Sequence, residues 1–164
     1  MPCPRLLAER DFCLAILGSG EERYEDFFAR LAHDHPTRIA FRRGYSEEHA
    51  HWIEAASDMF LMPSLYEPCG LNQMYSLRYG TVPIVRRTGG LADSVQHFDP
   101  ATRQGTGVVF EDFDVGGVVW GVGQAIEWYA NRGLWRRLVQ NAMAQDFSWK
   151  KQVSEYIALY ERLL

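Results

Sequence analysis

Short strand-like runs alternate with segments of helical spacing over the first 110 residues of the chain. Apolar or alternating runs, which are typical of strands in a parallel sheet, occupy residues 12–17, 38–42, 60–62, 82–85 and 108–110. The first of these is apolar throughout and predicts a strand buried on both faces. Helices are predicted over residues 21–33, 46–56 and 71–79, between the strands. Because the two types alternate with short connections, we expect an α/β, Rossmann-like domain: a parallel sheet with helices on both faces.

The pattern changes to helices alone after about residue 115. Three apolar stripes at helical spacing, over residues 115–129, 134–142 and 149–163, predict a helical C-terminal tail that packs into a core. Doubly wound sheets usually have about five or six strands, and this chain shows four clear strands and a fifth at residues 108–110. We therefore expect part of a larger sheet or protein, with residues 1–10 as a poorly defined leader and residues 11–164 as an incomplete domain.

The composition of the chain limits which partners it is expected to bind and where in the cell it is expected to be. The 164 residues are 47% hydrophobic and include five Trp, eight Tyr and nine Phe, enough for one packed domain. A net charge of −4 gives no global positive field, so no nucleic-acid partner is expected. No apolar run approaches the roughly 20 residues that cross a bilayer. The first residues also lack the layout of a signal peptide, so we expect no membrane partner and a cytoplasmic location.

A glycine-containing segment follows the first predicted strand. Gly18 and Gly20 match the first two glycines of the dinucleotide-binding pattern G-x-G-x-x-G, but Arg23 occupies the third position. A tight turn between a strand and a helix accounts for both glycines without a nucleotide. An NAD site is not predicted, because no acidic residue follows the second strand as that pattern requires.

The richest segment for chemistry is residues 63–73, where a strand ends and a helix begins near Gly70. In a parallel sheet this position lies at the carboxyl edge, where open α/β folds bind ligands. Glycine lets backbone amides approach a ligand closely, and the N-terminus of the next helix suits a phosphate. Glu67 would repel that phosphate. We therefore expect its carboxylate either to bind a hydroxylated group joined to the phosphate or to be a solvated turn residue.

A second glycine turn, residues 88–91, follows the strand at residues 82–85 and the basic pair Arg86 and Arg87. Two strand ends that carry glycine turns can cradle one ligand between them, and the basic side chains favour an anionic ligand. The two turns together predict a single binding site for an anionic, hydroxylated molecule.

Three motifs resemble those of bacterial glycogen synthases and plant starch synthases. They are P-S-L-Y-E-P-C-G-L at residues 63–71, L-R-Y-G-T-V-P at residues 77–83 and R-R-T-G-G-L-A-D at residues 86–93. Shorter stretches match in the same order, so the resemblance covers nearly the whole chain from Asp11 onward. The blocks E-P-C-G-L and R-R-T-G-G-L-A-D are highly specific in combination.

The resemblance implies a retaining glycosyltransferase with two Rossmann domains (the GT-B fold). Such an enzyme moves glucose from ADP-glucose to the non-reducing end of an α-1,4-glucan, in the bacterial cytoplasm or in a plant plastid. This chain resembles the second, donor-binding domain, so its partners would be ADP-glucose, the glucan and the missing N-terminal domain. Also missing is the strand-and-helix unit before residue 11 that carries a phosphate-binding Arg and Lys in the family. The alternative is a non-catalytic nucleotide-sugar or glucan-binding module with this fold.

The resemblance also implies roles for individual residues. Glu67 would bind the glucosyl hydroxyls and stabilise positive charge on the sugar ring, and Tyr45 would stack on the nucleobase, whether adenine or uracil. Relatives with an E-x7-E pattern have a second Glu where this chain has Tyr75, which favours a glucan synthase over sucrose- or lipid-directed relatives. The remaining donor-binding residues would line the nucleotide cleft, the distal phosphate or the glucose: Gly18, Cys69, Gly70, Leu71, Asn72, Thr88 and Gly89.

No cofactor and no metal are expected for this reaction. A covalent route to retention needs a carboxylate under the anomeric carbon, whereas the resemblance puts Glu67 beside the sugar hydroxyls. Departure of the diphosphate with attack from the same face, under electrostatic stabilisation of the leaving group, is therefore preferred. Asp112 and Asp114 have the D-x-D spacing of a metal site, but they follow the last strand and are interpreted as a solvated turn.

Overall fold

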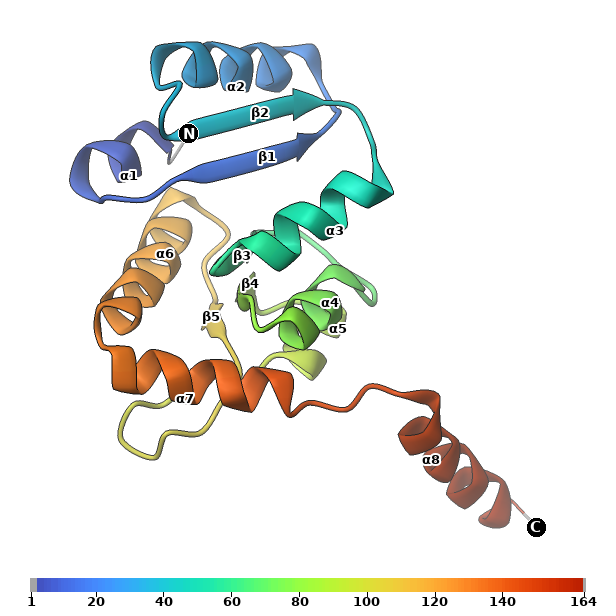
Figure 1. The fold of residues 1–164 in the computed structure, drawn as a ribbon. Coiled ribbons are helices and arrows are strands. Elements are labelled where there is room, and N and C mark those ends of the chain that lie inside the picture. The colour runs from blue at the N-terminus through green and yellow to red at the C-terminus, as the bar shows by residue number, and fades with distance from the viewer. Residues whose placement is uncertain (1–2, 164) are drawn as a thin grey trace.

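The computed structural model describes residues 3–163 and shows strands and helices that alternate along the chain (Figure 1). The strands within this range are β1 (Leu14–Gly18), β2 (Ile39–Arg43), β3 (Met59–Met62), β4 (Val82–Arg86) and β5 (Val108–Phe110). The helices are α1 (Cys3–Glu9), α2 (Glu22–Asp34), α3 (Glu47–Ala56), α4 (Asn72–Tyr79), α5 (Gly89–Ser94), α6 (Val115–Ala130), α7 (Arg132–Met143) and α8 (Trp149–Glu161). All the strands predicted from the sequence are therefore present.

The strands run parallel to their neighbours, but they form two sheets instead of the one that the pattern predicted. β1 pairs with β2, and β4 lies between β3 and β5. Within residues 3–163, β1 and β3 each have a single ladder partner. The prediction that the first strand is buried on both faces is wrong, because none of its residues is fully buried. A strand with one neighbour keeps its other edge, and part of both faces, open to solvent.

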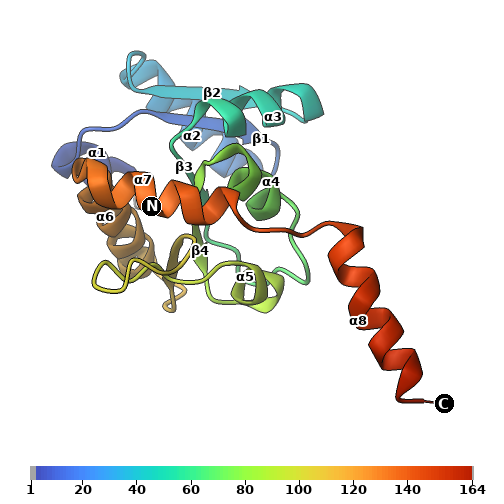
Figure 2. The ribbon, with the colours of Figure 1, turned by 60° about the horizontal axis from the view of Figure 1, so that its bottom comes forward.

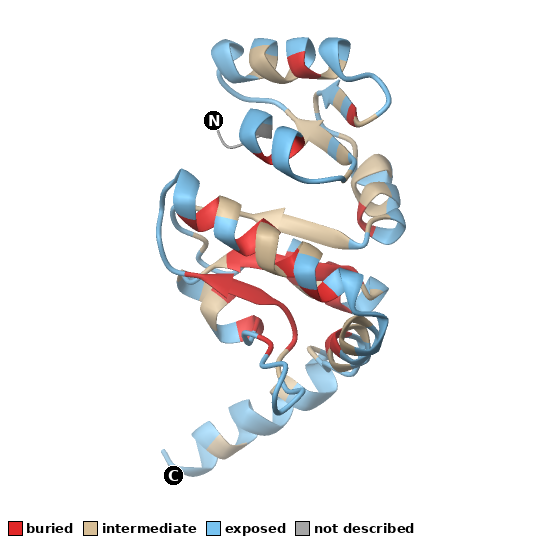
Figure 3. Cartoon of the chain, turned by 90° about the vertical axis from the view of Figure 1, so that its left-hand side faces the viewer, coloured by how far each residue is buried: buried red, intermediate tan, exposed pale blue. Residues whose placement is uncertain are grey.

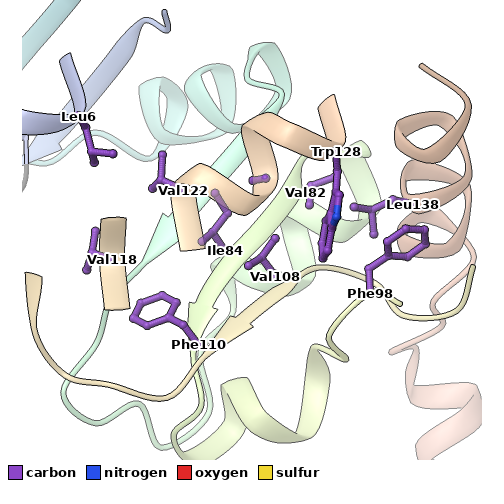
Figure 4. Close-up of a cluster of buried hydrophobic side chains, with 11 residues drawn as sticks. Leu6, Val82, Ile84, Phe98, Val108, Phe110, Val118, Val122, Trp128 and Leu138 are labelled. Atoms are coloured by element: carbon purple, nitrogen blue, oxygen red, sulfur yellow. The ribbon is translucent and has the colours of Figure 1, made fainter. Parts of the chain in front are cut away.

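Helices cover both faces of the three-stranded sheet. Alternate residues of a strand point to opposite faces, and Val82 and Ile84 of β4 join a buried cluster with residues of α6 (Figure 4). Val85, on the other face, packs with Leu91 of α5 and with Val95. Burial is concentrated on this sheet and the helices beside it (Figure 3). The Rossmann-like arrangement predicted from the sequence is thereby confirmed.

Helix α1 occupies most of the segment that the sequence analysis treated as a poorly defined leader. Leu6 and Leu7 are buried, and Leu6 belongs to the same core cluster as β4 and α6. The Arg38 guanidinium donates hydrogen bonds to the carbonyls of Leu7 (2.9 Å) and Arg10 (2.6 Å), which ties the end of α1 to the start of β2. A helix of seven residues is too short to show a helical period, which explains why the sequence did not predict it. Residues 1 and 2 lie outside the described residues.

The last helix, α8, extends away from the rest of the chain (Figures 1 and 2). None of its residues is buried, and Trp149 and Tyr160 in its apolar stripe are 75% and 63% exposed. The prediction that this stripe packs into a core is therefore wrong for the contacts made within residues 3–163. The stripes of α6 and α7 do pack into the core, through residues such as Val122 and Leu138.

A histidine is held between two tryptophans beside the core. The His97 ring stacks on Trp120, with ring centroids 5.8 Å apart, and lies 5.4 Å from Trp128. Its Nδ1 accepts a hydrogen bond of 3.0 Å from the Val109 backbone amide, so this nitrogen carries no proton. Although the residue reaches solvent, desolvation by this packing lowers the pKa of His97, with a further lowering by Arg87 and an opposing effect of Asp99.

We expect the free energy of unfolding to fall in acid through His97. Because the folded pKa lies below the unfolded value, this stabilisation is complete above the unfolded pKa, near 6.5, and is lost as the pH falls through the folded pKa. Urea unfolding at pH 7.5 and pH 5.5 would show a smaller loss for His97→Phe than for the wild type. The control, His33→Phe at a largely exposed side chain, should keep the wild-type loss.

Candidate functional site

The candidate residues all lie at or after the carboxyl ends of strands. Gly18 is the last residue of β1, Tyr45 comes shortly after β2, residues 67–72 follow β3, and residues 88 and 89 follow β4. In each sheet the strands are parallel, so their carboxyl ends lie at the same edge. The structure thus places the candidates where open α/β sheets bind ligands.

The turns after β3 and β4 are packed against each other. The Gly90 amide donates a hydrogen bond of 2.9 Å to the Glu67 carbonyl. A Cβ atom on Gly89 would collide with the Glu67 carbonyl oxygen, and one on Gly90 would collide with the backbone of Cys69. Gly89 also has a φ of +43°, which disfavours other residues. The two glycines are therefore required for the close approach of the turns.

The second turn is the start of a helix that the sequence did not predict. Thr88 is the N-cap residue of α5, and Leu91 and Ser94 of this short helix are buried. The sequence analysis treated residues 88–91 as a turn only, because two consecutive glycines disfavour a helix. Burial of Leu91 against β4 outweighs that low propensity.

Glu67 has an available carboxylate. Its side chain is half-buried, and Oε2 accepts one long hydrogen bond, 3.5 Å, from the Ser64 hydroxyl. Among the ion pairs formed within residues 3–163, none includes Glu67. Its backbone is held by Gly90, while its carboxylate keeps most of its hydrogen-bonding capacity for a ligand.

The backbone after Glu67 leads into the N-terminus of α4. Gly70 has a φ of +70°, and Leu71, the N-cap residue, provides no side-chain cap for the amides of the first turn. Cys69, Leu71 and Asn72 are all exposed. The amides at the start of a helix and its positive dipole end attract anions, so this end of α4 is suited to a phosphate, as the sequence predicts.

One member of the basic pair, Arg86, has a structural role that the sequence did not predict. Arg86 donates hydrogen bonds to the carbonyls of Ser64 (3.3 Å), Leu65 (2.8 Å) and Glu111 (3.2 Å). Arg87 forms an ion pair with Glu111. Arg86 therefore fastens the turn after β3 to the end of β4, whereas Arg87 is exposed and pairs with Glu111 through Nε alone.

Gly18 and Tyr45 lie together at the ends of β1 and β2. The Gly44 amide donates a hydrogen bond of 3.0 Å to the Gly18 carbonyl, and the φ of Gly44 is +112°. A Cβ on Gly18 would meet no atom within 4 Å, so there is open space beside this residue. Tyr45 is 85% exposed, which leaves both faces of its ring free for stacking.

Hollows elsewhere in the described structure are separate from the candidate residues. A hollow of about 520 Å³ lies between α1 and α6, lined by residues such as Arg10 and Trp120 and by none of the candidate residues. Over residues 3–163, no three His, Cys, Asp or Glu side chains are arranged to hold a metal ion. None of the helices in this range has the length and apolar character needed to span a membrane.

The sequence analysis assigned no role to Gln73, although the structure makes it part of the site. Its side chain is fully buried and donates a hydrogen bond of 3.0 Å to each of the Cys69 and Gly70 carbonyls. The available signal was an amide side chain in the first turn of a helix that follows a glycine. The sequence alone does not tell whether such a side chain faces the core or the solvent.

The fold is that of a Rossmann-like domain whose candidate residues lie beyond the carboxyl ends of parallel strands. Residues 3–145 match the family model described as glycosyl transferases group 1, and the chain belongs to this family. The class of enzyme implied by the sequence motifs is thereby confirmed.

Individual relatives agree with this assignment. The chain is 49% identical over 156 residues to the glycogen synthase of Koribacter versatilis, covering 95% of this chain and 32% of that protein. It is 51% identical over 160 residues to the glycogen synthase of an Anaeromyxobacter species, and the match covers 98% of this chain and 33% of that protein. A solved structure also matches: the catalytic domain of starch synthase IV from Arabidopsis thaliana bound to ADP and acarbose. The TM-score is 0.80 and the identity 36%, and the match covers 92% of this chain and 32% of that chain. The chain thus spans about a third of the length of these relatives.

Proposed function

We propose that this chain is the donor-binding domain of a retaining glucosyltransferase that moves glucose from ADP-glucose to the non-reducing end of an α-1,4-glucan. The observation that carries the proposal is the packing of the two glycine turns beside an available Glu67 carboxylate. The identity of about half to two glycogen synthases supports the reaction. The starch synthase IV structure, which was bound to ADP and acarbose, supports a nucleoside diphosphate donor and a glucan acceptor.

In this proposal the donor lies along the carboxyl edge of both sheets. Tyr45 stacks on the nucleobase and Gly18 lines the cleft beside it. The backbone of residues 69–72 contacts the distal phosphate and the glucose, assisted by the amides at the N-terminus of α4. Thr88 and Gly89 close the same site from the turn after β4, and Glu67 binds the glucosyl hydroxyls.

The geometry favours the same chemistry as the motifs. Glu67 stabilises positive charge that develops on the glucosyl ring as the bond to the diphosphate breaks, and the acceptor hydroxyl attacks from the face that the diphosphate leaves. Arg86 keeps its positive charge while it bonds to main-chain carbonyls, and Arg87 is exposed and pairs with Glu111 through Nε alone, so both side chains could contribute positive charge for the leaving diphosphate. In the family that charge belongs to an Arg and a Lys in a segment that this chain does not match. We propose that no metal ion or cofactor takes part.

The isolated chain is expected not to extend glycogen, because it spans only about a third of the relatives. A chimera in which this chain replaces the matching third of the Koribacter versatilis glycogen synthase is expected to be active. Incorporation of labelled glucose from ADP-glucose into glycogen measures the activity of the isolated chain and that of the chimera. Activity of the pure chain would contradict the first expectation. A folded chimera that binds ADP-glucose without turnover would favour the nucleotide-sugar-binding module instead.

Tyr45→Ala is expected to weaken ADP binding by about 1–3 kcal/mol, the range found when an aromatic ring that stacks on a base is removed. Because the ring is 85% exposed, the fold should be unaffected. Calorimetric titration of ADP into both proteins tests this, with Tyr160→Ala on α8, another exposed tyrosine, as the control. Equal affinities for the wild type and Tyr45→Ala would remove Tyr45 from the site.

A further inference from the structure

The Gln73 side chain connects the two glycine turns. Its Nε2 lies 3.0 Å from each of three oxygens: the Cys69 and Gly70 carbonyls, in the turn after β3, and the Ser94 hydroxyl, on α5 after β4. Gln73 is 0% exposed, so these bonds are shielded from water. One side-chain amide thus joins segments that are also connected by the backbone bond from Gly90 to Glu67 and by the bonds of Arg86 and Thr88 to the Leu65 carbonyl.

The partners require a donor at this position. Carbonyl oxygens only accept, and the single hydroxyl hydrogen of Ser94 is already donated to the Gly90 carbonyl at 2.6 Å. The three oxygens therefore share the two hydrogens of one NH₂ group, which also fixes the orientation of the amide. A carboxylate would repel all three, and an apolar side chain would leave them without this donor.

The amide oxygen of Gln73 leaves no room for a side chain at residue 70 in the turn after β3. Oε1 is buried, has no hydrogen-bond partner among the described residues and would collide with a Cβ atom on Gly70. A side chain at residue 70 would displace Gln73, and a displaced Gln73 would release Cys69 and Ser94. Gly70 is thus required both for its positive φ and for the place of this amide.

We propose that Gln73 is a positioning residue of the donor site, whose side-chain amide holds the turn that carries Glu67 and the turn that carries Gly89 in one arrangement. The role in a donor site rests on the proposed function, whereas the coupling of the two turns rests on the hydrogen bonds alone. Gln73 touches no ligand in this proposal. It acts through the Cys69 and Gly70 carbonyls and through Ser94, and so determines where the exposed amides of the first turn are presented.

Two substitutions test the proposal in the chain itself. Hydrogen exchange measured by NMR at pH 7 and pH 5 reports the protection factor of the Gly90 amide, which bonds to Glu67. Gln73→Glu at pH 7 is expected to lower this factor about tenfold, because a carboxylate faces three acceptor oxygens. At pH 5 much of the protection should return, since burial raises the pKa of an introduced carboxyl and the protonated group donates one O–H. Gln73→Met should lose protection equally at both pH values.

The controls separate this proposal from a packing role and from the proposed function. Gln140→Glu, at an exposed position of α7, should match the wild type at both pH values. Wild-type protection in Gln73→Met would overturn the proposal, and so would a loss in Gln73→Glu that acid does not reverse. ADP affinity of the same proteins should follow the Gly90 protection. If the wild type binds no ADP, the donor-site assignment fails, while the exchange data still decide whether Gln73 couples the turns.

Discussion

Glu67→Gln is expected to lower kcat of the chimeric glycogen synthase about 100-fold or more, the effect of removing one positioned electrostatic group from an active site. The substitution preserves size and the bond from Ser64, but it removes the negative charge that would stabilise the glucosyl ring. ADP affinity should remain unchanged, because ADP contains no glucose for Glu67 to bind. Initial rates of glucose transfer and an ADP titration on the same preparation measure both quantities.

A matched substitution distinguishes this role from a structural one. Glu48→Gln, at an exposed carboxylate in the first turn of α3, should leave kcat and ADP affinity as they are. If Glu67 were only a turn residue, its replacement would cost about 1 kcal/mol of stability and leave kcat intact. A lowered melting temperature with wild-type kcat would therefore remove Glu67 from the catalytic site.

Gly90→Ala is expected to destabilise the chain by about 2–3 kcal/mol, the cost of forcing extra volume into a well-packed place. The new methyl group would collide with the carbonyl, Cα and carbonyl carbon of Cys69, which are backbone atoms and cannot rotate away. Urea unfolding measures this loss. In the chimera, the same change should lower kcat, since the turn that carries Glu67 would be displaced.

Gly123→Ala is the control for that prediction. Gly123 lies inside α6, and the nearest atom to an added Cβ is an Arg10 guanidinium nitrogen 3.8 Å away. Alanine in a helix is more favourable than glycine by up to about 1 kcal/mol, so this variant should be slightly more stable than the wild type. Equal stability of the two alanine variants would contradict the packing described for the two turns.

Much of the fold could be predicted from the sequence because the strands and long helices have clear periods. The apolar run at residues 82–85 and the helix closed by Gly80 follow local rules, and Gly80 has the left-handed conformation expected of a residue just past a helix. The partition into two sheets was not predictable, since pairing depends on which strands meet in space. Nor was the exposure of α8, because an apolar stripe looks the same whether or not a partner covers it.

For the candidate site, the motifs located the edge but not the way it is held together. Glycine turns and Glu67 were evident from residue type and spacing. The structural role of Arg86 was not foreseen, because a guanidinium near a glycine turn suits an anion and three main-chain carbonyls equally well. Gln73 was overlooked, because its importance comes from Ser94, a residue 21 positions away that only the folded chain brings close.

The division into two sheets has a mechanical consequence for the donor site. Gly18 and Tyr45 lie at the end of the β1–β2 ladder, whereas Glu67 and Gly89 follow strands of the other sheet, and within residues 3–163 no strand pairing joins the two sheets. Units without shared hydrogen bonds can open separately, each with its own free energy. Helix α3, which contacts both β1 and α4, is the main element that connects them after β2. The span between the nucleobase and sugar ends of the proposed site therefore depends on this helical connection and not on one continuous sheet.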